Sequence, residues 1–389
     1  MINFDFDKYC CGCAACYNIC PVQAISMQCD ETGFLFPHID IEKCIDCGLC
    51  ERVCPHITKQ DFQADKVLND SWLYSSKDKD GIMKSSSGGA FYEMAKAALK
   101  TGDYVCGCCW NNNLQAEHII INDMDDLYKL QGSKYVQSNI GKVYKEIINL
   151  LKENRKVLFS GTPCQAIAIN NLVLKINKNF RKNLTIVALI CHGVASPKAW
   201  ETHKTYLAKK NGSKLKEVNF RDKSQEGYKK SYCKYVYEDG STTYLPTFLP
   251  SSKWMEASIV YNLTTRNSCG QCDCKGLTAA IDIIIGDWYA IYKGDGKYGT
   301  SCITACTDTG KNYVINNLKD LKSISYTEIL KYNSLIEKST KINKNRNNFL
   351  NNLSVDGWDL VERYYPKKYK LKKFLVECGL YDILKKFYK

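Results

Sequence analysis

The sequence predicts a small cysteine-rich α+β module, followed by a larger α/β body with a mixed sheet and a helical carboxyl-terminal tail. Three observations predict this fold class. A cysteine motif occurs twice near the amino terminus, short apolar runs alternate with helical stretches in the middle of the chain, and a Lys/Asn-rich helical pattern begins near Tyr326. A chain of 389 residues has room for two or three domains. We therefore divide it into segments 1–60, 61–155, 156–325 and 326–389.

The amino-terminal module carries the strongest chemical signal. The motif Cys-x2-Cys-x2-Cys-x3-Cys-Pro occurs at Cys10, Cys13, Cys16 and Cys20, and again at Cys44, Cys47, Cys50 and Cys54. This is the spacing of bacterial ferredoxins with two 4Fe-4S clusters, in which the fourth cysteine of each motif binds the other cluster. We expect one cluster on Cys10, Cys13, Cys16 and Cys54, and the other on Cys44, Cys47, Cys50 and Cys20.

Zinc is the alternative for such a cysteine pattern. Paired CxxC units also build zinc sites, but four thiolates per zinc do not require two complete copies of this longer motif. Cys11 and Cys29 fall outside the spacing, and we interpret them as bystanders. A two-cluster module of this kind stores and passes single electrons.

Composition limits the class of protein. The chain has no uninterrupted apolar run of ~18 residues, and its polar start is not typical of a signal peptide, so we expect a cytoplasmic protein. In that reducing compartment, metal or redox chemistry explains 22 cysteines better than disulfides do. Residues 1–60 carry four Lys/Arg and eight Asp/Glu, a net charge of −4, so a total of +13 leaves +17 for residues 61–389. No nucleic-acid motif accompanies this basic body, and an acidic partner such as a small ferredoxin fits the charge equally well.

The body begins with a serine- and glycine-rich segment, residues 85–89, ahead of an apolar helical stripe that ends at Thr101-Gly102. Amide donors at such a helix start suit a phosphate, although a serine cap before a structural helix has the same pattern. Apolar runs and helical stretches then alternate over residues 104–109, 143–151, 157–160, 166–174 and 185–190, which predicts the mixed sheet. Residues 231–245 place aromatics around a Glu-Asp-Gly-Ser turn, and we expect a β-hairpin attached to that sheet.

Three loops after strand-like runs carry cysteines in the body. Cys164 lies in Ser-Gly-Thr-Pro-Cys-Gln, Cys191 in Cys-His-Gly, and Cys269 and Cys272 in a Cys-x2-Cys pair. Loops that follow strands gather at one edge of an α/β sheet, so these four thiolates are candidates for a third 4Fe-4S cluster. Cys274 could replace Cys191 or Cys272. The remaining body cysteines are interpreted as small buried hydrophobes: Cys106, Cys108, Cys109, Cys233, Cys302, Cys306 and Cys378.

Taken together, these motifs carry a family resemblance over nearly the whole chain. They are the two cysteine motifs, Ser-Ser-Gly-Gly at 86–89, Gly-Ser-Lys-Tyr-Val-Gln-Ser at 132–138, the three cysteine loops, and the segment from Asp282 to Asp287-Trp288. The chain resembles the coenzyme F-420 hydrogenase/dehydrogenase beta-subunit family, here with a fused ferredoxin module. The resemblance implies FAD beside a 4Fe-4S cluster, with segment 61–155 as a flavin-binding part and segment 156–325 as the part with the third cluster.

The resemblance also implies which residues contact the flavin. They are Ser86, Ser87, Gly88, Gly89, Ser133, Lys134, Tyr135, Val136, Gln137, Thr162 and Pro163. Lys134 would place positive charge near a reduced flavin ring, or it is an ordinary loop lysine. Asp287 would line the same pocket or cap a turn. His192 would relay protons to substrate or flavin, or it is a structural histidine beside the cluster. Tyr289-Ala290 departs from the family, which usually has glycine after the aromatic residue of its aspartate–tryptophan motif.

These expectations lead to an FAD-containing oxidoreductase that takes single electrons from a ferredoxin and delivers two-electron equivalents to a small organic acceptor. The alternatives are an oxidoreductase subunit that uses coenzyme F-420 and a non-catalytic relay subunit of a larger complex. The basic end of the chain, residues 364–389, could form an amphipathic helix that docks an acidic ferredoxin or an anionic membrane surface, or that merely covers the core.

Overall fold

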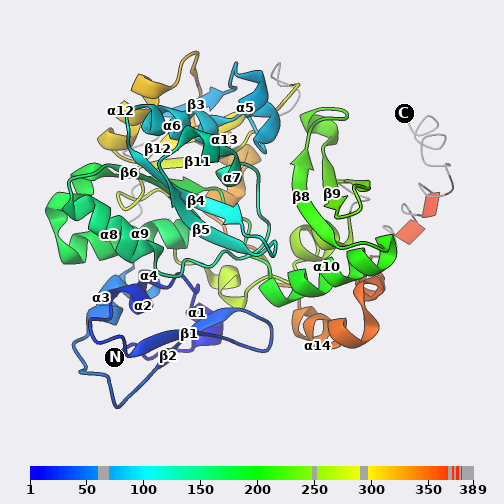
Figure 1. Cartoon of the computed structure of the whole chain (residues 1–389), viewed down its shortest axis with the longest axis horizontal. Coiled ribbons are helices and arrows are strands. Elements are labelled where there is room, and N and C mark those ends of the chain that lie inside the picture. The colour runs from blue at the N-terminus through cyan, green and yellow to red at the C-terminus, as the bar shows by residue number, and fades with distance from the viewer. Residues whose placement is uncertain are drawn as a thin grey trace.

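The computed structural model describes residues 1–59, 70–247, 252–289 and 297–366, together with residues 370, 371, 374, 375 and 378. It contains a small amino-terminal module, a body built on a large sheet, and a second, smaller sheet beside that body (Figure 1). The expected combination of a mixed sheet with covering helices is confirmed. Within the described ranges, no helix is both long enough and apolar enough to cross a bilayer.

The amino-terminal module consists of one hairpin and four short helices. Strands β1 (Ile25–Cys29) and β2 (Leu35–Ile39) pair antiparallel, with Ile25 opposite Ile39. The helices are α1 (Phe6–Tyr9), α2 (Ala15–Ile19), α3 (Leu49–Val53) and α4 (Pro55–Thr58). Ala14 and Gly48 precede α2 and α3 in the left-handed region, at φ 60° and 68°, so each cysteine motif turns sharply where its third ligand begins a helix. This turn is what allows closely spaced cysteines to face a common centre.

The body is built on an eight-stranded sheet in the order β13-β3-β12-β11-β7-β6-β4-β5. Its strands are β3 (Ser71–Tyr74), β4 (Tyr104–Trp110), β5 (Ala116–Ile121), β6 (Val157–Gly161), β7 (Leu184–Leu189), β11 (Ile283–Asp287), β12 (Ser301–Ala305) and β13 (Lys322–Ser323). The four central strands β4, β6, β7 and β11 run parallel, and the outer pairs are antiparallel. The expected segment boundary at residue 156 falls between β4 and β6, which are neighbours in this sheet.

Helices cover both faces of the sheet. One face carries α8 (Val143–Lys152) and α9 (Pro163–Ile176), and the other carries α6 (Ala90–Lys100) and α12 (Asp308–Asn317). The amino-terminal module lies against α8 and α9 (Figure 1), and its Ala15 and Val53 are buried in the same apolar cluster as those helices. Asn18 Nδ2 donates to the Gly141 carbonyl at 2.9 Å, which fixes the module to the body further. Short helices α5 (Lys79–Lys84), α7 (Leu127–Leu130) and α13 (Tyr326–Tyr332) complete this part.

The predicted hairpin exists, but its expected attachment to the large sheet is wrong. Strands β9 (Tyr232–Tyr237) and β10 (Thr242–Pro246) pair as predicted, and they join β8 (Leu215–Asp222) in a separate three-stranded sheet. The reason is its own aromatic core. Trp200 on α10 (Pro197–Asn211) and Trp254 on α11 (Lys253–Met255) pack with Phe220, and Trp358 follows α14 (Arg346–Asp356) into the same cluster.

The described part of the segment after residue 325 is helical and does not form a separate tail. Tyr326, Ile329 and Ile336 pack into the core of the large sheet, whereas Phe349 and Leu353 pack under the small one. Both cores therefore depend on this segment. The predicted amphipathic end, residues 364–389, lies mostly outside the described residues.

Candidate functional site

The first cysteine set lines one cavity inside the amino-terminal module, here called the module cavity. Cys10, Cys13, Cys16 and Cys54 face about 380 Å³ of empty space bounded by apolar side chains such as Ile2, Phe4 and Met27. Cys54 comes from the second motif, so the structure brings together the crossed set that the spacing predicted. Burial and the nearby Cys10 and Cys54 thiols raise the pKa of Cys16 above its ordinary value, and a contact with the amide of Tyr17 offsets part of that rise. A bound iron would offset that burial by holding the sulfur as thiolate.

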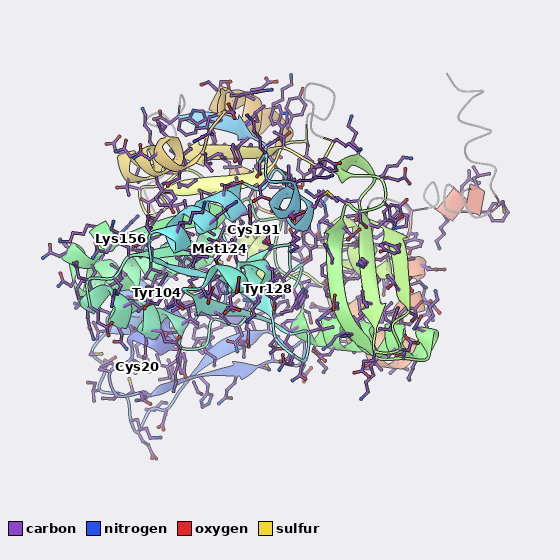
Figure 2. All side chains as sticks on the ribbon, turned by 45° about the horizontal axis from the view of Figure 1, so that its top comes forward. Cys20, Tyr104, Met124, Tyr128, Lys156 and Cys191 are labelled. Atoms are coloured by element: carbon purple, nitrogen blue, oxygen red, sulfur yellow. The ribbon has the colours of Figure 1, made fainter. Side chains whose placement is uncertain are left out.

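The second cysteine set lies at the outer end of the module. Cys20 is at the margin of the molecule in Figure 2, far from Cys191 at its centre. Cys47 is exposed, whereas Cys20, Cys44 and Cys50 are half-buried. The amide of Ala24 donates to Cys20 Sγ at 3.2 Å, which is the type of N–H···S contact that helps set cluster potential.

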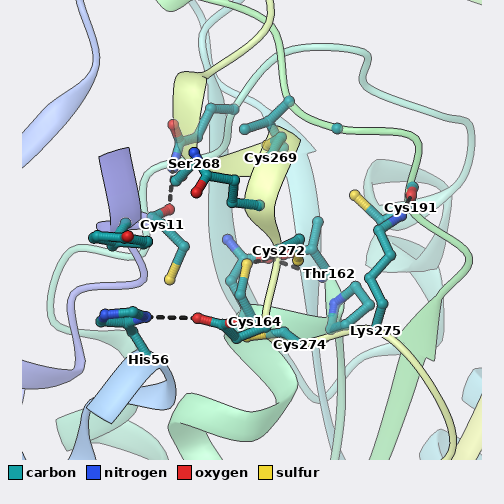
Figure 3. A pocket seen from close by; sticks show the side chains of 18 residues that line it. Cys11, His56, Thr162, Cys164, Cys191, Ser268, Cys269, Cys272, Cys274 and Lys275 are labelled. Carbon is teal, nitrogen blue, oxygen red and sulfur yellow. Dashed lines mark hydrogen bonds and ion pairs between the residues drawn. The ribbon is translucent and has the colours of Figure 1, made fainter. Parts of the chain in front are cut away.

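The third cysteine set lines a cavity at the centre of the body, here called the body cavity. Cys164 is the second residue of α9, directly after β6, and Cys191 follows β7. Cys269 lies in the 3-10 helix η6 (Asn267–Gln271), and Cys272 follows it. All four thiols face about 680 Å³ of empty space (Figure 3), and each lies within electrostatic range of the other three.

The arrangement in the body cavity fits a cluster better than a single ion. Among the described residues, no three His, Cys, Asp or Glu side chains meet closely enough to bind one metal ion together. A 4Fe-4S cluster spreads its ligands further apart because each thiolate binds its own iron. The amides of Gly193 and Val194 lie near the Cys191 and Cys269 thiols and lower their pKa values, although burial dominates and leaves both pKa values raised. The donors present therefore suit a 4Fe-4S group, and the ligand assignment stays a prediction.

Two further thiols reach the body cavity. Cys274 lies next to Cys272 and lowers the pKa of that thiol to about 7, so its choice as an alternative ligand stays open. Cys11, which the spacing placed among the bystanders, lies between Cys13 of the module and Cys164 of the body. Lys275 donates to the backbone carbonyls of Cys191 and Leu335, and it adds a positive charge at the cavity wall.

His192 stands beside this cavity with its ring held elsewhere. Its neighbours Cys191 and Gly193 line the cavity, whereas His192 Nε2 lies 2.7 Å from Asn262 Oδ1 and 3.4 Å from the Thr340 hydroxyl. Burial lowers the pKa of His192. These contacts favour the structural interpretation of His192 over a proton relay.

The residues expected to contact flavin fall into two groups. Gln137, Thr162 and Pro163 line the body cavity, and the Thr162 hydroxyl lies 3.1 Å from Cys164 Sγ. Val136 is buried beside the small sheet. Ser86 and Ser133 lie together ahead of α6, whereas the Lys134 ammonium donates to backbone carbonyls that closely precede it in the chain. The amide and hydroxyl of Ser133 both donate to Ser86 Oγ, at 2.7 and 2.8 Å, and Lys134 Nζ donates to the Gln131 carbonyl at 2.7 Å.

Other members of the serine–glycine segment are explained by packing. A Cβ on Gly88 would lie 2.3 Å from the Tyr74 carbonyl and 2.4 Å from the Ser301 amide, so strands β3 and β12 require glycine there. Ser87 Oγ donates to the Thr300 carbonyl, and Gly89 caps α6 at φ 83°. The paired hydroxyls of Ser86 and Ser133 are groups that can hydrogen-bond a phosphate, whereas Gly88 needs no ligand to account for it.

Asp287 joins the two sheets. At the end of β11, its carboxylate accepts from Arg221 Nη2 at 2.8 Å and from the Tyr228 hydroxyl at 3.0 Å, and Arg221 Nη1 also reaches Tyr135 Oη at 3.3 Å. Lys223, next but one on the chain, donates to the Ile82 and Ser87 carbonyls at 2.7 Å. Burial lowers the pKa of Lys223 to about 7. Sequence reasoning missed both basic residues because Arg221 lies at the end of β8 and Lys223 directly follows that strand, and the sequence does not predict a separate small sheet.

Comparison with known proteins identifies both parts of the chain. Residues 154–330 match the family described as the carboxyl-terminal part of the beta subunit of coenzyme F420 hydrogenase/dehydrogenase, and residues 9–57 match the 4Fe-4S dicluster domain. Residues 154–330 are therefore similar to the carboxyl-terminal part of that beta subunit, and residues 9–57 are similar to a 4Fe-4S dicluster domain. The resemblance inferred from the motifs is confirmed, and the chain is an iron–sulfur protein related to oxidoreductase subunits.

The individual relatives cover the chain unevenly. An uncharacterized protein of Methanocaldococcus jannaschii is 27% identical over 215 residues, which is 47% of this chain and 59% of that protein. A 7Fe ferredoxin of Hydrogenibacillus schlegelii is 35% identical over 71 residues, 18% of this chain and 82% of that protein. A solved chain of the F420-reducing [NiFe] hydrogenase complex from Methanosarcina barkeri aligns with a TM-score of 0.47 at 17% identity, covering 72% of this chain and 90% of that one. The chain thus spans less than two thirds of the M. jannaschii relative.

Proposed function

We propose that this chain is an iron–sulfur flavoprotein oxidoreductase. It takes single electrons from a ferredoxin-type donor through the two clusters of the amino-terminal module, and passes them by way of a third cluster to FAD and a two-electron organic acceptor. The observation that carries the proposal is the arrangement of the cavities. Tyr9, Cys11 and His56 line both the module cavity and the body cavity, so one thin wall separates two sets of cysteines.

The protein's own residues would perform three tasks in this scheme. Cysteines would bind the clusters, with the set that includes the exposed Cys47 facing a donor and the half-buried set that includes Cys164 lining the body cavity. The apolar walls exclude water from the module cavity, and backbone amides near the sulfurs stabilise their negative charge. Bound FAD would supply the conversion between one-electron and two-electron chemistry.

The flavin assignment rests on two features of the body. Thr162, Pro163 and Gln137 line the body cavity, and the hydroxyls of Ser86 and Ser133 meet at 2.8 Å ahead of α6. Lys134 is the candidate cation for a negatively charged cofactor, although burial lowers its pKa. We place Asp287 with Arg221 as a link between the sheets that shapes the acceptor side of the same region.

The proposal is tested by anaerobic purification followed by quantification of iron, sulfide and flavin. Twelve proposed ligands, four for each cluster, predict three clusters and about twelve irons per chain, together with about one FAD. Cys164→Ser and Cys269→Ser should each remove about four irons, whereas Cys29→Ser, at an exposed position in the module, should remove none.

Three results would contradict parts of the proposal. About eight irons in the wild type would eliminate the third cluster. Twelve irons without flavin would leave an electron-relay subunit. Bound flavin with turnover only when coenzyme F-420 is supplied would identify a subunit dependent on that coenzyme.

A further inference from the structure

The wall between the two cavities is formed by Tyr9, Cys11 and His56, which line both of them, and it therefore contains a cysteine that is not a proposed cluster ligand. Cys10 and Cys11 are consecutive, yet Cys10 belongs to the module cavity alone, whereas Cys11 lines both cavities. In Figure 3 the Cys11 side chain points toward the centre of the body cavity from the module side. The Cys11 side chain shares the module cavity with Cys13 and the body cavity with Cys164, and its thiol interacts electrostatically with both. It is therefore a sulfur placed between one proposed ligand of each cluster.

A buried arginine holds the backbone at this position. Arg266 is 1% exposed, and its Nε donates to the Cys10 carbonyl at 2.7 Å, its Nη2 to the Leu35 carbonyl at 3.0 Å and its Nη1 to Gln137 Oε1 at 2.9 Å. Gln137 completes the arrangement by donating from Nε2 to the Cys11 carbonyl at 3.0 Å. The carbonyls of two successive residues are thus each bonded to a side chain of the body.

The same guanidinium also packs on the module's strand β2. It lies 4.2 Å from the ring centre of Phe36 and 5.1 Å from that of Phe34. A Cβ on Gly12 would lie 2.8 Å from both Arg266 Nη1 and Gln137 Nε2, so glycine is needed for this close approach. With three bonds and two ring contacts, Arg266 fixes the orientation of the module more tightly than a surface ion pair would.

The third wall residue is tied across the boundary as well. His56 Nδ1 lies 2.6 Å from Oδ2 of Asp273, the residue between Cys272 and Cys274 in the sequence. The His56 ring stacks on the Tyr9 ring, with 4.5 Å between the ring centres. The boundary is therefore held on both sides of Cys11, by Arg266 with Gln137 and by His56 with Asp273.

We propose that the Cys11 thiol bridges electron transfer between the cluster on Cys10, Cys13, Cys16 and Cys54 and the cluster in the body cavity, and that Arg266 and Gln137 are positioning residues for it. The inference rests on the proposed function. One electron leaves the module side and one arrives on the body side, while Cys11 keeps its proton and no bond is made or broken. The probability of electron tunnelling falls off less steeply with distance through contacting atoms than across an empty gap. The Cys11 thiol therefore speeds the step between the two clusters by filling part of the gap between them.

The test follows one electron through anaerobically purified protein. A light-activated reductant reduces the exposed cluster of the module, and rapid freeze-quench EPR records when the body cluster becomes reduced. Cys11→Ala should slow this second step several-fold, with iron content equal to wild type. Cys29→Ala, an exposed cysteine in the same module, is the matched control and should leave the rate unchanged.

The positioning role has its own readout. Gln137→Leu removes the bond to the Cys11 carbonyl and one partner of Arg266, so it should slow transfer between the clusters. The iron content and the EPR signal of the fully reduced body cluster should stay at the wild-type level, which loss of folding would not allow. Gln137→Glu keeps an acceptor for Arg266 and should recover part of the rate.

Two outcomes would overturn the inference while leaving the proposed function intact. A wild-type transfer rate in Cys11→Ala with full iron would show that Cys11 is no bridge, and a loss of about four irons in that variant would make it a ligand instead. A wild-type protein without a third cluster would instead refute the proposed function itself.

Discussion

His203 allows a quantitative prediction about stability. It lies on α10 with 0% exposure, inside the aromatic core of the small sheet, and its ring centre is 4.4 Å from Trp358 and 5.7 Å from Trp254. Within the described residues, neither ring nitrogen has a hydrogen-bond partner. Burial, aided by the charge of Lys253, lowers the pKa of His203 from 6.5 to about 3. The folded protein therefore holds the neutral ring.

The sign of the pH effect follows from that lowered pKa. Above pH 6.5 both folded and unfolded chains carry a neutral His203, so its contribution to stability is complete there. As the pH falls from 6.5 toward 3, the unfolded chain binds a proton at His203 that the folded chain does not bind. The free energy of unfolding therefore drops by about 1.4 kcal/mol per pH unit. One unit below 6.5, at pH 5.5, the loss is about 1.4 kcal/mol, which for a chain of 389 residues is about 2 °C in the unfolding midpoint.

The change His203→Phe removes this dependence. We expect the variant to be at least as stable as wild type at pH 7.5, because two unpartnered buried nitrogens disappear. Its advantage should grow by about 2 °C between pH 7.5 and 5.5 when thermal unfolding is measured anaerobically. His38→Phe, at an exposed position on β2, controls for the added ring. Parallel midpoint curves for wild type and His203→Phe would refute this account of the buried ring.

Three further predictions follow from other parts of the structure. Asp282 is 1% exposed and accepts from Arg181 at 2.9 Å, from the Ile186 amide at 2.8 Å and from Thr307 at 2.7 Å; Asp282→Asn should therefore cost about 3–5 kcal/mol in denaturant unfolding. Asp320→Asn, in an exposed pair with Lys77, should cost less than about 1 kcal/mol and is its control. Cys54→Ala should remove the EPR signal of the cluster on Cys10, Cys13 and Cys16 while the cluster on Cys20, Cys44, Cys47 and Cys50 remains, and the reverse pattern would contradict the crossed assignment. Ser86→Ala removes the acceptor for both Ser133 donors, so we expect flavin content to fall with iron unchanged; equal flavin would move the cofactor elsewhere.

The sequence predicted the features that depend on local spacing. The two cysteine motifs predicted which thiols face the module cavity, and the strand-to-loop positions of Cys164 and Cys191 predicted that they would meet, because neighbouring parallel strands end at one edge. Contacts between residues that are far apart in the sequence could not be predicted in this way. Arg266 touches Cys10 across 256 positions, and no local pattern marks an arginine for that contact. Cys11 lies outside the motif spacing, so the sequence marks it as a bystander. Its position beside the body cavity arises only when the amino-terminal module packs against the body.

The order of synthesis gives one more consequence of this topology. Strands β1 and β2 and both cysteine motifs lie within the first 59 residues, so the amino-terminal module has all its local contacts early and can receive its clusters as soon as it emerges. Strand β3 must wait for β12 and β13, which follow it by more than two hundred residues. The body cavity needs side chains from Cys11 to Lys275. Assembly of the proposed clusters is therefore expected in two stages, with the module loaded first and the central site only after the residues up to Lys275 have been made and have packed against the module.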